Sequence, residues 1–244
     1  MRSVLLPASP ALPVSVWLVD SRVAGDLALR LAPGLLDPGQ RGRLAAMRRE
    51  VDRRTYAAGH VALRQLLGAR LGMAPEAVRF RRRPCVGCGG PHGRPEAVGG
   101  GGVRFSLSHS GDLALIAIAA EAVGVDVERV PEAEIAASAA EVLHPSEAAE
   151  VADLAPDLRP AAVARAWTRK EAYLKGTGAG LSRSTAIDYL GTGPSPAAYP
   201  EGWALRDVAV PDGYAAAVAV AATTSVLEDR SRTAWGAPRL ASAR

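Results

Sequence analysis

Asp126 and Glu128 are two carboxylates whose spacing suggests a binding site. They lie in the segment GVDVE, which has the composition of a strand, and residues two apart on a strand project from the same face. Two like charges held side by side destabilise each other unless a cation joins them. The pair therefore indicates either a cation site or the solvated edge of a strand.

A third carboxylate and an ammonium group follow on a segment with helical spacing. Glu171 and Lys175 are four residues apart, as are Trp167 and Glu171, so these side chains line one stripe of a helix. The three carboxylates, Asp126, Glu128 and Glu171, would suit a hard divalent ion such as Mg²⁺, which binds oxygen ligands and keeps positions open for water and phosphates. The alternative is an ordinary surface pair between Glu171 and Lys175.

Lys170 and Lys175 are the only lysines among 29 basic residues, and they lie five residues apart. Lysine is a compact point charge and arginine a planar fork, so the two are not interchangeable. We therefore predict that this segment needs a compact ammonium group, with coincidence as the alternative.

The segment SLSHSG combines hydroxyls, an imidazole and backbone N–H groups where a strand runs into a turn. Ser108 and His109 could hold a phosphate there. The alternative is that the His109 imidazole only makes hydrogen bonds within its own turn. No Gly-x-Ser-x-Gly elbow surrounds it, so a hydrolase triad is not expected.

Cys85, Cys88 and His92 could supply three zinc ligands from one loop, but a fourth is not evident unless His109 or a partner provides it. Reduced loop cysteines are the alternative.

Two runs of arginines, 48–54 and 79–83, are interpreted as solvated faces, although arginines clustered in a groove would bind phosphate bidentately.

The composition bounds the class of protein. The chain has 244 residues, 48% hydrophobic and 22% charged, which excludes wholesale disorder, collagen and coiled coil. No apolar run reaches the roughly 18 residues of a membrane span, and we expect no signal peptide. Two cysteines fit a reducing compartment, so a cytoplasmic location is predicted. The net charge of +4 favours anionic partners without demanding nucleic acid.

Hydrophobic periodicity and turn residues predict the elements that position these groups. Strands are expected at 14–20, at 77–81, on both sides of a turn at 110–112, and at 122–130, 185–190, 203–210 and 214–222. Helices are expected within 38–72, near 133–141, near 146–154 and from about 160 to 175. The segment 84–102 is expected to be irregular.

This order of elements predicts an α+β fold with a mixed or antiparallel sheet. The segments 103–120 and 204–222 both read as a strand, an Asp/Gly turn and an Ala-rich apolar strand, which suggests a duplicated unit. We therefore expect an N-terminal half over 1–121, a C-terminal half with the carboxylates over 122–222, and a flexible tail over 223–244.

Taken in order, the motifs resemble the 4′-phosphopantetheinyl transferases of the larger, surfactin-synthetase-activating (Sfp) type. The resemblance runs through DRRTYAAGHVALRQLLG, HGRP, FSLSHSG, GVDVE, WTRKEAYLKGTGAGL and GYAAAVAVA, within residues 36–222. It implies a monomer of two similar α+β halves related by a pseudo-twofold axis, with coenzyme A and Mg²⁺ bound between them. The implied reaction moves the 4′-phosphopantetheine arm of coenzyme A onto a serine hydroxyl of a carrier protein and releases adenosine 3′,5′-bisphosphate.

The resemblance also implies a role for each motif residue. Metal binding is implied for Asp126, Glu128 and Glu171, the same three residues that strand and helix spacing selected. Glu171 matches the family's general base, acting directly or through a water, and Lys175 would hold the pyrophosphate. Further contacts to coenzyme A are implied for Arg43, Arg94, Ser108 and His109, with His109 at the 3′-phosphate.

One position departs from the family. The basic residue often found three residues after Asp52 is Thr55 here, and Arg54 is the candidate to take over its contact. The implied partners are acyl, polyketide or peptidyl carrier proteins of secondary metabolism, which present an acidic helix to this basic chain.

Two other functions compete with this interpretation. A metal-dependent nuclease or phosphodiesterase also uses a strand Asp-x-Glu and a helix carboxylate around Mg²⁺, but it would not need coenzyme A. A Cys/His zinc loop that binds nucleic acid would show stoichiometric zinc and strongly salt-dependent binding. Neither accounts for SLSHSG and KEAYLK together.

Overall fold

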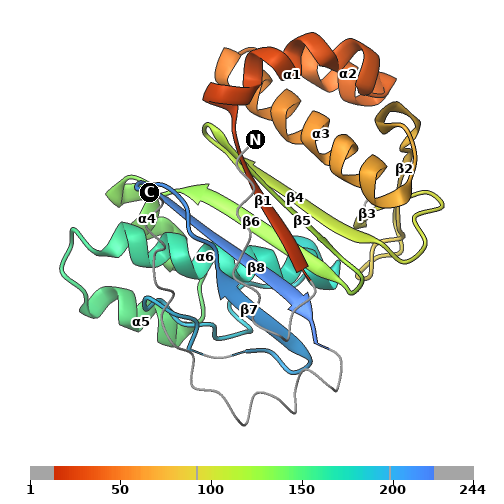
Figure 1. Ribbon diagram of the computed structural model, residues 1–244. Helices are drawn as coiled ribbons and strands as arrows, with labels where there is room; N and C mark the ends of the chain where they lie inside the picture. The colour runs from red at the N-terminus through yellow and green to blue at the C-terminus, as the bar shows by residue number, and fades with distance from the viewer. Residues whose placement is uncertain (1–13, 92, 198, 223–244) are drawn as a thin grey trace, which may run out of the picture.

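Two three-stranded antiparallel sheets lie between two sets of helices in the computed structural model (Figure 1), which describes residues 14–91, 93–197 and 199–222. The first sheet has the order β1-β5-β4 and contains β1 (Val14–Asp20), β4 (Arg104–Ser110) and β5 (Leu113–Ala119). Every residue of the central strand β5 is buried, which explains its continuous apolar sequence.

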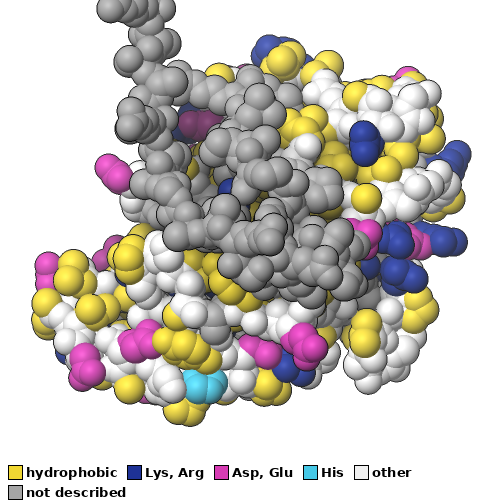
Figure 2. Space-filling view, turned by 60° about the horizontal axis from the view of Figure 1, so that its bottom comes forward, with side chains coloured by type: hydrophobic (Ala, Val, Ile, Leu, Met, Phe, Trp, Pro, Cys, Tyr) yellow, Lys and Arg dark blue, Asp and Glu magenta, His cyan; other side chains and the backbone are white. Residues whose placement is uncertain are grey.

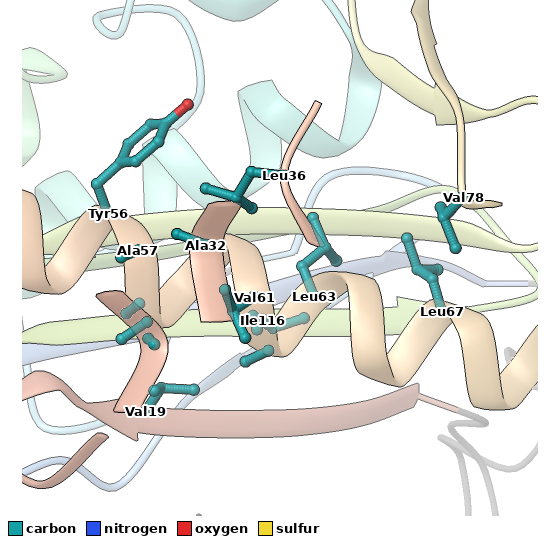
Figure 3. Close-up of a cluster of buried hydrophobic side chains, with 14 of the residues drawn as sticks. Val19, Ala32, Leu36, Tyr56, Ala57, Val61, Leu63, Leu67, Val78 and Ile116 are labelled. Carbon is teal, nitrogen blue, oxygen red and sulfur yellow. The ribbon is translucent and has the colours of Figure 1, made fainter. Parts of the chain in front are cut away.

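The helices α1 (Ser21–Leu35) and α3 (Glu50–Leu71) cover one face of this sheet, and α2 (Pro38–Ala46) packs on α3. Figure 3 shows their core, in which Val61 and Leu67 of α3 pack with Val19 and Ile116 of the sheet. Gly59 lets α3 approach β5, because a Cβ added there would lie 3.1 Å from the Ala114 Cβ.

The second sheet has the order β6-β8-β7 and contains β6 (Val123–Arg129), β7 (Trp203–Asp207) and β8 (Tyr214–Ala221). Its helices are α4 (Ala133–Ala140), α5 (Pro145–Asp153) and α6 (Arg159–Thr177). The helix α6 packs directly on β6 and β8. It ends where Gly178 adopts a left-handed conformation, with φ at 80°.

Both sheets have the same connectivity. In each, the first strand is followed by helices and then by a hairpin whose second strand pairs with the first. The sheets adjoin where β4 meets β6: Val125 N donates to Ser106 Oγ at 3.1 Å, and Arg129 N donates to Ser110 Oγ at 3.2 Å. The shared connectivity agrees with the predicted duplication, whereas the pseudo-twofold axis and the division at residue 121 stay predictions.

Several expected elements are confirmed and three need correction. The strand expected at 122–130 is confirmed as β6, in the second sheet. The strand expected at 77–81 starts later, as β2 (Phe80–Arg82), because 75–77 form a 3-10 turn. The segment 84–102 is not wholly irregular, since it contains β3 (Pro95–Ala97), which pairs with β2.

The third correction concerns 185–190, which is not a strand. At its end, Leu190 N and Gly191 N both donate to the Glu147 carboxylate on α5, at 2.7 and 3.1 Å. The Glu147 side chain therefore accepts the backbone hydrogen bonds that a neighbouring strand would accept in a sheet. The helix α1 was not anticipated, because Gly25, Pro33 and Gly34 interrupt its helical pattern.

No helix within the described ranges is long and apolar enough to cross a membrane. The predicted tail, 223–244, lies outside the described residues, as do 1–13 of the predicted N-terminal half. The cytoplasmic location stays a prediction.

Candidate functional site

Two glycines bring the strand β6 and the helix α6 into close contact. A Cβ added to Gly124 would lie 2.0 Å from the carbonyl oxygen of Ala172, and one added to Gly176 would lie 2.6 Å from the Trp203 ring. Side chains at these positions would push the helix away from the sheet. The glycines therefore hold the GVDVE strand against the helix that carries Glu171 and Lys175.

Asp126 is the centre of the contact between three elements. Its side chain is 1% exposed, and its Oδ1 accepts hydrogen bonds of 2.6 Å from Ser108 Oγ on β4 and from Lys175 Nζ on α6. Lys175 Nζ also lies 3.1 Å from Ser108 Oγ. Three residues predicted for the site, from segments far apart in the sequence, are thus joined by hydrogen bonds.

Two carboxylate oxygens at this centre are buried and have no hydrogen-bond partner within the described part of the chain: Asp126 Oδ2 and Glu171 Oε1. Leaving a buried acceptor unpaired typically costs 1–3 kcal/mol, and more when it is charged. Native proteins therefore pair such atoms with a donor, a water or an ion.

The carboxylates also affect each other's ionisation. The pKa of Glu171 is raised, first by burial and then by Asp126, while Lys175 opposes the shift. The pKa of Glu128 is raised by burial in the first place; Ser110 and Lys175 lower it, and Asp126 and Glu171 raise it. The three predicted metal ligands therefore share one electrostatic environment.

The donor set fits a divalent cation only in part. Among the described residues, no three His, Cys, Asp or Glu side chains are arranged to hold a metal ion by themselves. The two unpartnered oxygens of Asp126 and Glu171 are nevertheless the hard anionic ligands that Mg²⁺ requires. Mg²⁺ at phosphate-transfer sites is commonly held by one or two carboxylates and completes its shell with substrate oxygens and water. The residues fit a cation that arrives with a phosphate substrate.

A second group of polar side chains surrounds His109 on β4. The His109 ring meets the Tyr56 ring edge to face, with centroids 6.4 Å apart, and Tyr56 lies 4.2 Å from His60 on the same helix. The pKa of His109 is lowered by burial among its neighbours and by the Lys175 ammonium, although the residue remains accessible to solvent. Burial lowers the pKa of His60 to about 4, so this ring is neutral at pH 7.

Arg43, predicted to contact coenzyme A, lies on the last turn of α2 and is exposed. Its guanidinium is close enough to Tyr56 to oppose the raised pKa that burial gives the phenol. Tyr56 and His60 were not predicted as site residues. Their spacing of four on a predicted helix was the available signal, but it does not separate a site residue from a core residue.

Arg94 reaches the same end of α6 from the β2–β3 loop. Its Nη1 donates to the Gly176 carbonyl oxygen at 2.6 Å, one residue after Lys175. The pKa of Arg94 is lowered by burial and by Arg104 and Arg83. The structure thus brings this predicted residue to the carboxylate site.

Arginines gather around one carboxylate on the β2–β3 hairpin. Glu96 lies 2.5 Å from Arg81, 3.5 Å from Arg83 and 3.9 Å from Arg104, so the group carries excess positive charge. Figure 2 shows basic side chains gathered at the right edge of the molecule in that view, on the side where β2 and β3 lie in Figure 1. Part of the run at 79–83 therefore clusters around Glu96, while the side chains of Arg81 and Arg83 stay exposed, as expected of a solvated face.

Arg54 is engaged elsewhere. Its Nη2 lies 2.5 Å from Asp26 on α1 and its Nε 3.0 Å from Glu50, which ties the start of α3 to α1. Thr55, where the family often has a basic residue, is buried and donates to the Gly111 carbonyl oxygen at 2.8 Å. A contact between Arg54 and coenzyme A stays a prediction, and the ion pairs seen here would have to break for it.

The two lysines have different environments. Lys175 is at the site, whereas Lys170 is 2% exposed and forms a 2.7 Å ion pair with the fully buried Glu147. Lys170 also donates to the Asp188 carbonyl oxygen. The ammonium at 170 therefore joins α6 to α5 and to the loop that follows α6, and it does not belong to the carboxylate site.

Cys85 and Cys88 are not joined in a disulfide; Cys85 is buried and Cys88 is exposed. The backbone N–H groups of Cys88 and Gly87 point at the Cys85 sulfur and lower its pKa. His92 lies outside the described residues, so the predicted zinc site cannot be traced there.

Sequence comparison places these features in a known family. A sequence model described as the 4′-phosphopantetheinyl transferase superfamily matches residues 122–207, which carry the three carboxylates and Lys175. The 4′-phosphopantetheinyl transferase HetI of Nostoc sp. is 33% identical over 177 residues, which cover 69% of this chain and 71% of HetI.

Two further relatives agree. A putative 4′-phosphopantetheinyl transferase of Synechocystis sp. is 31% identical over 159 residues, or 62% of each chain. The 4′-phosphopantetheinyl transferase AcpT of Salmonella typhimurium is 33% identical over 140 residues, or 57% of this chain and 66% of AcpT. These similarities favour a transferase over the nuclease and the zinc-loop module. The chain therefore belongs to the 4′-phosphopantetheinyl transferase superfamily, and it is a holo-carrier-protein synthase, an enzyme that transfers phosphopantetheine to carrier proteins.

Proposed function

We propose that the enzyme moves the 4′-phosphopantetheine arm of coenzyme A onto a serine hydroxyl of an acyl, polyketide or peptidyl carrier protein, with Mg²⁺, and releases adenosine 3′,5′-bisphosphate. The observation that supports this most is the pair of unpartnered buried oxygens, Asp126 Oδ2 and Glu171 Oε1, beside the Lys175 ammonium. This arrangement provides anionic ligands and a fixed cation, which a pyrophosphate substrate and its metal ion would complete.

Glu171 is the proposed general base. Burial and the neighbouring Asp126 raise its pKa, which makes the ionised carboxylate a better proton acceptor than an exposed glutamate. Its free Oε1 has no hydrogen bond to give up before it accepts a proton, directly or through a water. The serine hydroxyl would lose its proton to the Glu171 carboxylate, directly or through a water. The serine oxygen would attack the β-phosphorus of coenzyme A, and the bond from this phosphorus to the adenosine 3′,5′-bisphosphate leaving group would break.

Lys175 is the proposed binding group for the pyrophosphate. Its ammonium donates to Asp126 Oδ1 and Ser108 Oγ, and its side chain is one-third exposed, so one of its three N–H donors is left for a ligand. A point charge in this position favours the transition state as negative charge develops on the leaving phosphate. Ser108 Oγ orients Asp126 and lies against the ammonium, and we propose that it positions both groups while lining the phosphate site.

Mg²⁺ would be held by Asp126, Glu128 and Glu171 together with substrate oxygens. When bound, it would neutralise the pyrophosphate and the charge that develops on the leaving group. The nucleotide end of coenzyme A would lie toward His109 and Arg43, with Arg94 at the end of α6.

The partner is proposed to be a carrier protein with an acidic surface, since the chain carries a net charge of +4. We further propose that the enzyme is a cytoplasmic monomer of the Sfp type that serves polyketide or nonribosomal peptide biosynthesis. The repeated connectivity of its two sheets supports the two-halved arrangement of that type.

The direct test is the intact mass of an apo carrier protein incubated with the enzyme, coenzyme A and Mg²⁺. A gain of one phosphopantetheine is expected, and it should be absent with a carrier Ser→Ala variant or with a chelator. Carriers of the acyl, polyketide and peptidyl classes should be compared side by side. No mass gain on any of the three classes would contradict the proposal, and a gain that persists in chelator would contradict its metal.

A further inference from the structure

Cys85 and Cys88 are two thiols in the loop between β2 and β3, and the proposed reaction uses neither of them. A tight turn joins them, in which Gly89 N donates to the Cys85 carbonyl oxygen at 2.8 Å and Gly89 is left-handed, with φ at 72°. Cys85 N donates to the Gly90 carbonyl oxygen at 2.7 Å, which closes the loop on itself. Backbone hydrogen bonds therefore fix the positions of both cysteines.

The two sulfurs have different surroundings. Cys85 is buried, and its sulfur accepts hydrogen bonds from the backbone N–H groups of Cys88 and Gly87 and from the Cys88 thiol. Such donors favour the thiolate, which is the nucleophile in thiol–disulfide exchange. Cys88 is exposed. An oxidant can therefore reach Cys88 from solvent, and Cys85 lies within reach as the second thiol.

The described residues favour a disulfide over a metal ion at this pair. Structural zinc is held by four ligands, and no three His, Cys, Asp or Glu side chains in the described part of the chain could hold a metal ion. A disulfide needs only these two sulfurs. Their hydrogen bond shows that the two side chains point toward each other, as a disulfide requires.

The same loop packs against the end of α6 and the turn that follows it. A Cβ added to Gly87 would lie 2.9 Å from Ser182 Oγ, and one added to Gly178 would lie 3.6 Å from Val86 Cγ2. Gly178 ends α6, and Ser182 lies in the next turn. The two residues between the cysteines therefore contact the helix that carries the carboxylate site.

Arg94 connects the other end of this loop to the site. Its Nη1 donates to the Gly176 carbonyl oxygen at 2.6 Å, one residue after Lys175. Its own carbonyl oxygen accepts a hydrogen bond from Arg83 N at 3.0 Å, where the loop begins. A residue predicted to contact coenzyme A therefore anchors the cysteine loop to α6.

Oxidation would change the turn where it contacts α6. In a disulfide the Cys85 sulfur carries no negative charge, so its hydrogen bonds from Gly87 and Cys88 lose the strength that a charged acceptor gives them. Because Gly87 lies against Ser182, a movement of the turn is passed to the end of α6.

We propose that Cys85 and Cys88 form a reversible disulfide by exchange with low-molecular-weight disulfides, and that this bond controls how Arg94 rests on α6. Cys88 loses its proton to solvent, and its sulfur attacks the external disulfide and releases one thiol. Cys85 then attacks the Cys88 sulfur of the mixed disulfide, and the second external thiol leaves with the Cys85 proton. Two protein thiols are oxidised, and one external disulfide is reduced to two thiols.

The first test incubates the full chain with glutathione disulfide and measures its intact mass before and after alkylation with iodoacetamide. The wild type should lose the mass of two hydrogen atoms and take up no alkyl group, because the chain has only two cysteines. A phosphine reductant should restore both thiols.

Two matched variants separate the roles of the cysteines. Cys85→Ser should stop at the mixed disulfide and keep the glutathione adduct on Cys88. Cys88→Ser should react far more slowly than the wild type, because the remaining thiol is buried. A wild type that keeps the adduct without closing the disulfide, or a Cys88→Ser variant as reactive as the wild type, would overturn the proposal.

Zinc is the competing ligand for this pair, so the metal content of the purified wild type is measured as well. A stoichiometric zinc ion that protects both cysteines from alkylation would overturn the disulfide. Metal-free protein with two alkylatable thiols is the expected result.

The control over Arg94 is tested by calorimetric binding of adenosine 3′,5′-bisphosphate, a probe whose choice rests on the proposed function. The bisphosphate has no thiol, so it cannot reduce the disulfide as coenzyme A would. Its dissociation constant should rise by about 2- to 10-fold on oxidation, the usual effect of weakening one hydrogen bond, and return with the reductant. The double variant Cys85→Ser/Cys88→Ser should not respond to the oxidant.

The outcomes separate this inference from the proposed function. An oxidised wild type with unchanged affinity for the bisphosphate would overturn the control over Arg94. A wild type whose affinity follows its oxidation state but which modifies no carrier protein would support the inference and contradict the proposed reaction.

Discussion

Lys175 Nζ donates to Asp126 Oδ1 over 2.6 Å, so the ammonium of α6 is bound to a carboxylate on β6. The helical spacing of Glu171 and Lys175 had suggested a pair within α6, but Glu171 Oε1 has no partner among the described residues. The cross-element pair leaves one oxygen on each carboxylate free for a ligand. It also gives Lys175 a structural role beside the binding role proposed for it, and the two can be separated experimentally.

Replacing Lys175 by methionine should abolish transfer and lower the free energy of unfolding by about 1–3 kcal/mol, because Asp126 is left as an unpaired buried charge. Adding Asp126→Asn should recover much of that stability without restoring activity. Urea unfolding and the carrier mass assay measure the two effects. A Lys175→Met variant with normal transfer would show that the ammonium only supports the fold.

Glu171→Gln should keep the fold and reduce transfer by at least 10²-fold, because an amide can neither accept the serine proton nor bind Mg²⁺ as an anion. Removing the charge of a buried carboxylate should leave the unfolding temperature unchanged or raise it. The matched control is Glu134→Gln, the same change at an exposed position on α4. Near-normal transfer by Glu171→Gln would contradict the base assignment.

Periodicity placed the carboxylates correctly, because the strand and helix that carry them are set by local sequence. The alternation of GVDVE and the spacing of WTRKEAYLK predicted Asp126 on a strand and Glu171 and Lys175 on a helix, and the structure confirms both elements. That these residues form one metal and substrate site stays a prediction. Their hydrogen bonds were beyond prediction, because these depend on how closely α6 approaches β6. That distance is set by Gly124 and Gly176 acting together.

Other residues were misread or missed because their role depends on tertiary neighbours. Lys170 was grouped with Lys175 because the two lysines are five residues apart, yet the buried Glu147 on another helix binds its ammonium group. The segment 185–190 was predicted to be a strand, but the Glu147 side chain accepts the backbone hydrogen bonds at its C-terminal end.

Gly124→Ala should destabilise the protein by about 1–3 kcal/mol or more, since the added methyl group would lie 2.0 Å from the Ala172 carbonyl oxygen. Transfer should fall with it, because the helix must move away from Asp126. Gly42→Ala is the control: nothing lies within 4 Å of a Cβ there, and alanine stabilises a helix interior by up to about 1 kcal/mol. Thermal unfolding of both variants tests the close approach, and equal stability of the two would refute it.

His60 should make the fold sensitive to mild acid. Its pKa is lowered to about 4 in the folded protein, chiefly by burial, against a usual value near 6.5. The surrounding charged and titratable groups are His109 on β4, Arg64 on α3, Arg43 on α2 and Asp37 before α2.

Below pH 6.5 the unfolded chain takes up a proton at His60 that the folded chain rejects until about pH 4. The contribution of His60 to stability is therefore complete above pH 6.5 and is lost as the pH falls toward 4, at up to about 1.4 kcal/mol per pH unit. Carboxylates add their own pH dependence, so the informative quantity is the difference between wild type and His60→Gln. Urea unfolding at pH 7 and pH 5 should show a smaller loss of stability in the variant. Parallel losses in the two proteins would mean that the imidazole is not desolvated in the native state.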